Sequence, residues 1–90
     1  MKPDQRPQLA KMARLKLDPI EKKHVLLAPE RGIVLSASAA AILTRCDGAR
    51  TIDGIAAELA EGSGAPVEDV RNDVIAFVAE MAKRGFVEMA

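Results

Sequence analysis

Short apolar runs separated by turn residues occupy the first third of the chain. From Arg14 to Asp18 polar and apolar side chains alternate, which is the period of a half-buried strand. Further apolar runs follow at 24–28 and 33–35, with prolines and a glycine between the runs. The pattern predicts a small antiparallel meander. Residues 1–11 hold two prolines and mostly polar side chains, so we expect a flexible arm there and a single domain over 12–90.

The apolar spacing changes to that of helices at the end of the third run. Ser36 and Ser38 both suit a helix N-cap, and 39–46 then places apolar side chains on one face of a first helix. Thr51 is the expected cap of a second helix, which the glycines of 62–64 end. Two short helices are therefore expected directly after the meander.

A third, longer helix is expected near the C-terminus. Pro66 suits its first turn, and Lys83 and Arg84 favour its end electrostatically before Gly85 stops it. Its apolar stripe consists of Val67, Val70, Val74, Val78 and Met81. A short extended segment, 86–88, closes the chain. The order βββααα predicts an α+β, winged helix-turn-helix-like domain, with three short antiparallel strands followed by three helices.

Reactive side chains are too few for a catalytic or metal site. His24 and Cys46 are the only histidine and cysteine, and a catalytic dyad is a weaker interpretation than a strand-edge polar residue and a small buried hydrophobe. Asp69 and Asp73 lie one helical turn apart without a histidine nearby, which favours a solvated helix face over a metal site. The glycines of 62–64 lack the lysine of a P-loop. We expect no enzymatic activity, metal or cofactor.

Charge is unevenly distributed although the net charge is zero. Residues 1–35 carry eight Lys/Arg and four Asp/Glu, giving +4, whereas 51–80 carry one Arg and seven Asp/Glu, giving −6. Acidic helices oppose phosphate contacts, so a winged-helix DNA-binding regulator is a weaker alternative and no nucleic-acid partner is expected. No apolar run approaches the ~20 residues of a membrane span, and the N-terminus has no signal-peptide pattern. These features favour a cytoplasmic protein without a membrane partner.

Three segments carry a family resemblance. They are Leu26 to Ser36, the tripeptide Cys46-Asp47-Gly48, and the close of the third helix at Arg84 to Glu88. Over roughly residues 12–88 the chain resembles the PqqD family of pyrroloquinoline quinone (PQQ) biosynthesis. The resemblance implies a non-catalytic peptide chaperone, which binds the precursor peptide PqqA and passes it to the radical SAM enzyme PqqE. A recognition element of another pathway for ribosomally made, modified peptides (RiPPs) is the alternative.

The resemblance also implies where the peptide binds. In this fold a leader peptide adds as a strand beside the third strand and packs against the third helix. The apolar stripe of that helix, from Val67 to Lys83, is widened by two further apolar side chains, with an arginine beside them. The expected peptide-contacting residues are Ile33, Val34, Leu35, Ser36, Arg71, Ile75, Val78 and Ala82. A free sheet edge can also pair with a second copy of the chain, so a homodimer is a further alternative.

Overall fold

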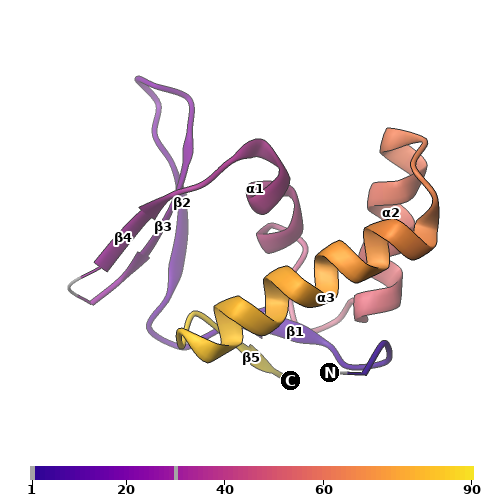
Figure 1. Cartoon of the computed structure of the whole chain (residues 1–90). Coiled ribbons are helices and arrows are strands. Elements are labelled where there is room, and N and C mark those ends of the chain that lie inside the picture. The colour runs from indigo at the N-terminus through magenta and orange to yellow at the C-terminus, as the bar shows by residue number, and fades with distance from the viewer. Residues whose placement is uncertain (1, 30) are drawn as a thin grey trace.

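The computed structural model describes residues 2–29 and 31–90, and within them the chain forms five short strands and three helices (Figure 1). The strands are β1 (Pro7–Leu9), β2 (Arg14–Leu17), β3 (His24–Ala28), β4 (Arg31–Val34) and β5 (Val87–Met89), and the helices are α1 (Ala37–Leu43), α2 (Ile52–Ser63) and α3 (Val67–Lys83). Strands β2, β3 and β4 form an antiparallel sheet in that order, and β1 pairs with β5. The α+β class and the three-stranded meander are confirmed.

The N-terminal segment belongs to the fold, which corrects the flexible arm expected for residues 1–11. Strand β1 pairs with β5 in antiparallel register, the N–H of Ile52 donates to the carbonyl of Gln5 at 2.9 Å, and that of Ala90 donates to the carbonyl of Arg6 at 2.8 Å. The short extended segment expected at 86–88 is largely part of strand β5 (Val87–Met89), which pairs with β1. Met1 of this segment, and Glu30 of the segment that carries the resemblance, lie outside the described residues.

Two of the expected helix caps are confirmed. The Oγ of Ser36 and the Oγ1 of Thr51 each accept a hydrogen bond from the N–H three residues later, at 3.2 and 3.0 Å. Because Ser36 is the cap, α1 begins at Ala37 and Ser38 lies within it; the helix covers 37–43 rather than 39–46. Pro66 precedes α3 at the cap position instead of occupying its first turn.

The core lies between the helices and one face of the three-stranded sheet. Its largest fully buried side chains are Phe86, Leu26, Leu43, Ile52, Ile55, Val74, Val78 and Pro7. Val67, the first residue of the apolar stripe of α3, is 40% exposed. Figure 1 shows α3 crossing the molecule, with α1 and the three-stranded sheet on one side and the β1–β5 pair on the other. Helix α3 thus has two distinct flanks.

Candidate functional site

Strand β4 forms one edge of the three-stranded sheet. The N–H of Leu35 donates to the carbonyl of His24 at 2.9 Å, and bonding alternates along an antiparallel ladder. Residues 31, 33 and 35 therefore direct their backbone groups toward β3. The N–H and C=O groups of Gly32 and Val34 point to the open edge, where an extended peptide can pair with them.

The start of β4 lies against the end of α3, and α1 borders one flank of that helix. The guanidinium of Arg31, at the start of β4, donates to the carbonyl of Arg84 at 3.1 Å, just beyond the end of α3. Helices α1, α2 and α3 together border a pocket of about 380 Å³, to which α3 contributes Val70, Asp73 and Val74. At 3.6 residues per turn, Phe77 falls on the same flank. We call Val70, Asp73 and Phe77 the β4-side flank; two of these side chains are apolar and one is a carboxylate.

The helix residues expected to contact a peptide lie on the opposite flank. The Nε of Arg71 donates to the Oδ1 of Asp53 at 2.6 Å, in the first turn of α2. By helical spacing Ile75 and Ala82 share that flank, where both are half-buried. Val78 is fully buried in the core. Arg71, Ile75 and Ala82 thus lie on the flank of α3 away from this pocket and Val78 lies in the core, and their expected contact with a peptide stays a prediction.

The strand residues expected at the site serve different purposes. Ile33 is half-buried against the core and Leu35 is buried, while Ser36 caps α1. Val34 alone among the four exposes a large apolar side chain, at 63%. Gly32 was missed because β4 begins two residues earlier than the apolar run.

Phe77 was the other residue that sequence reasoning missed. A signal for it was present: it is one of only two aromatic residues, and it stands seven positions after Val70 and four before Met81. This spacing places Phe77 beside the buried stripe of α3. In the structure its side chain is half-buried and packs against the core.

Cys46 is a structural residue. Its side chain is 5% exposed, and its Sγ donates to the carbonyl of Ile42 at 3.4 Å rather than contacting His24. Burial, with the nearby Asp47 carboxylate, raises the pKa of the Cys46 thiol to about 11. A nucleophile needs the thiolate form, so this environment opposes a catalytic dyad.

We expect Cys46 to resist alkylation in the folded protein. A pKa of about 11 instead of 9.0 leaves about one hundredth of the thiolate at pH 8, and burial slows access further. Iodoacetamide at pH 8 should therefore modify the native protein at least about a hundredfold more slowly than the urea-unfolded protein. The measurement is intact-mass spectrometry over time, and equal rates in the two states would contradict the assignment.

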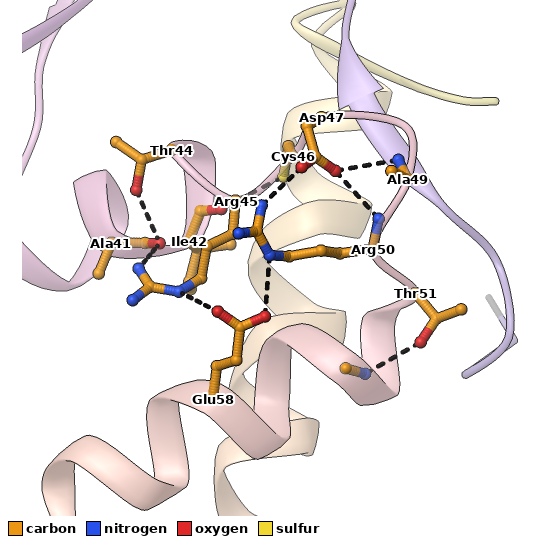
Figure 2. A network of polar contacts seen from close by, with 11 residues as sticks. Ala41, Ile42, Thr44, Arg45, Cys46, Asp47, Ala49, Arg50, Thr51 and Glu58 are labelled. Carbon is orange, nitrogen blue, oxygen red and sulfur yellow. Dashed lines mark hydrogen bonds and ion pairs between the residues drawn. The ribbon is translucent and has the colours of Figure 1, made fainter.

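The Cys-Asp-Gly tripeptide ties the loop between α1 and α2 to its surroundings (Figure 2). The Oδ1 of Asp47 accepts from the N–H groups of Ala49 and Arg50 at 2.9 and 3.0 Å, and the Nε of Arg50 donates to Glu58 of α2 at 2.8 Å. Gly48 has a φ of 78°, and its N–H donates to the carbonyl of Pro7 in β1 at 2.9 Å. The motif that carries much of the resemblance is therefore a structural one.

Asp47 should make the stability of the protein depend on pH. Hydrogen bonds from the N–H groups of Arg50 and Ala49 hold the pKa of the Asp47 carboxyl below its ordinary value of 3.8. A depressed folded-state pKa adds stability that is fully present above about pH 4 and is lost as the pH falls through the folded-state value. Asp47→Asn should thus be less stable than the natural chain at pH 7, in urea unfolding followed by circular dichroism. The difference should shrink below pH 4; a constant difference would refute the assignment.

Over residues 2–29 and 31–90, no helix is long and apolar enough to cross a membrane. Over the same ranges, no group of three or more His, Cys, Asp or Glu side chains is arranged to hold a metal ion.

Similarity to known proteins covers nearly the whole chain. A family model described as coenzyme PQQ synthesis protein D (PqqD) matches residues 23–87. The PqqA binding protein of Rhizobium meliloti is 44% identical over 82 residues, which are 91% of this chain and 84% of the relative. The bifunctional coenzyme PQQ synthesis protein C/D of Methylorubrum extorquens is 35% identical over 82 residues, but these are only 22% of its length. In that relative the matching part is one portion of a longer chain.

Solved structures share the fold. The solution structure of the PqqD truncation of Methylobacterium extorquens PqqCD, described as a RiPP recognition element, matches with a TM-score of 0.77 at 35% identity, over 91% of this chain and 87% of that one. The crystal structure of PqqD from Xanthomonas campestris gives a TM-score of 0.58 at 31% identity, over 93% of both chains. Lasso peptide synthetase B1, solved in complex with the leader peptide, gives a TM-score of 0.79 at 19% identity over 92% of this chain and 98% of that one, a likeness of fold alone.

Proposed function

The chain belongs to the PqqD family, and on that premise we propose that it binds the PqqA precursor peptide and, without catalysing a reaction itself, presents it to the radical SAM enzyme PqqE. Relatives named as PqqA binding proteins support the choice of peptide. The family resemblance supports the choice of enzyme. The observation that carries a peptide-binding role is the open edge of β4, whose first residue, Arg31, bonds to the end of α3.

In the proposed site, the main chain of β4 would supply affinity and the side chains of α3 would supply specificity. Main-chain groups of Gly32 and Val34 would pair with the backbone of an added strand, which gives affinity that is indifferent to side chain. Alternate side chains of that strand would point toward α3. There Val70 and Phe77 favour apolar peptide side chains, and Asp73 disfavours an acidic one at the pocket mouth.

A proline scan of β4 separates peptide binding from folding. In Val34→Pro the lost N–H faces the open edge, so the sheet keeps its ladder and the edge loses a donor. We expect the fold to persist by circular dichroism and PqqA binding to weaken about fivefold to tenfold by calorimetry. In Ile33→Pro the lost N–H faces β3, so stability should fall instead. If Val34→Pro binds PqqA as tightly as the natural chain, the proposed edge is wrong.

A further inference from the structure

The three-stranded sheet has a second face, turned away from the core. Leu26 of β3 is fully buried, so side chains at the alternate positions of the strands point outward. What we call the outer sheet face consists of Arg14, Lys16, Val25, Leu27 and Val34. Leu27 and Val34 are 37% and 63% exposed. A surface that combines three apolar side chains with two cations suits contact with another protein.

The two charged side chains of the outer sheet face, Arg14 and Lys16, are both cations and both lie on β2. The register aligns Lys16 of β2 with Val25 of β3 and Val34 of β4, so the face runs from a cation at β2 to apolar side chains at β4. Pockets of about 310 and 250 Å³ adjoin Leu27. Lys16 and Asp18 border the first, and Lys11 and Arg14 border the second. The ion pairs found within residues 2–29 and 31–90 engage neither cation. The complementary surface is acidic, with apolar side chains that fit the pockets.

The position of this face relative to the peptide site identifies its occupant. A peptide strand added at β4 would extend the sheet, and every second peptide side chain would then project on the outer face. A protein docked there would contact those side chains while α3 holds the others. Building on the proposed function, we propose that the outer sheet face docks the peptide-modifying enzyme, through an acidic surface of that enzyme bearing apolar side chains.

Charge reversal on β2 tests the docking surface. The test variant is Arg14→Glu with Lys16→Glu, and the matched control is Lys2→Glu with Lys83→Glu, which changes the net charge equally at exposed positions elsewhere. With purified PqqE titrated by calorimetry at low salt, the test variant should bind about tenfold more weakly than the control variant. Both variants should bind PqqA within about twofold of the natural chain. Leu27→Ser should also weaken the enzyme complex, but its effect should not depend on salt concentration as the effect of the double charge reversal does.

Each outcome is decisive. Selective loss of enzyme binding in the β2 variant supports the docking face. Equal loss of enzyme binding in both variants would show that only net charge matters and would overturn the docking face. The docking face would also be overturned if the β2 variant changed only self-association, measured by sedimentation. If the natural chain binds PqqA but not PqqE, the docking face and presentation fail while peptide recognition stands. If the natural chain binds PqqE but not PqqA, the proposed function fails, and the variants still decide whether this face docks the enzyme.

Discussion

Phe86→Ala is expected to lower the free energy of unfolding by about 3–5 kcal/mol. The side chain is 1% exposed, so truncation leaves a cavity where α3, the β1–β5 pair and β4 meet. The Phe86 carbonyl accepts from the N–H of Ala10 at 2.8 Å, and the Arg31 guanidinium lies 4.7 Å from the ring centroid. For a 90-residue chain the whole free energy of unfolding is on the order of 5–10 kcal/mol, so this loss is a large part of it. The melting temperature should fall by about 15–30 °C in calorimetric scans.

A conservative replacement at the same position is the control. Phe86→Leu keeps most of the buried volume but loses the ring beneath Arg31, so we expect a loss of about 1–2 kcal/mol. If the alanine variant melted within a few degrees of the natural chain, Phe86 would not join these elements, and the packing described for the C-terminal end of α3 would be wrong.

Phe77→Ala is expected to weaken PqqA binding about thirtyfold while leaving the protein folded. A half-buried aromatic ring at a peptide interface commonly contributes about 2 kcal/mol to binding, which corresponds to that factor. Because the ring is not fully buried, the cost in stability should be nearer 1 kcal/mol. Calorimetric titration with PqqA and urea unfolding measure the two effects separately.

Ile75→Ala is the matched control, because Ile75 lies on the opposite flank of the same helix. Its truncation should change PqqA binding by less than about twofold, with a modest loss of stability. The reverse result, with Ile75 essential and Phe77 silent, would restore the helix flank that the sequence alone suggested and would contradict the placement of the site.

Local signals in the sequence predicted much of the fold. Ser36 and Thr51 cap helices as expected because an N-cap bond is made within three residues of its donor. The bounds of α3 follow from its apolar spacing and from Gly85, which has a φ of 82°. Helix caps and helix ends depend on residues that are close along the chain, so the residue types at these positions were enough to predict them.

Long-range features could not be predicted in the same way. Strand β1 is only three residues long and pairs with β5 at the other end of the chain, so no periodic pattern announces it. Which flank of α3 faces a peptide also depends on contacts between distant parts of the chain. An apolar stripe that is wider than one core face shows that something packs there. Arg71 reaches α2, and Val70 and Asp73 line a pocket beside α1, only because of how α1 and α2 are placed.

Amide NMR of the labelled protein titrated with PqqA tests the central claim most directly. We expect the chemical shifts to change most at Gly32 and Val34 on the β4 edge, and at Val70, Asp73 and Phe77 on α3. Changes concentrated on β2, or on Arg71, Ile75 and Ala82, would contradict it, because they would place the peptide at the other edge of the sheet or on the other flank of the helix.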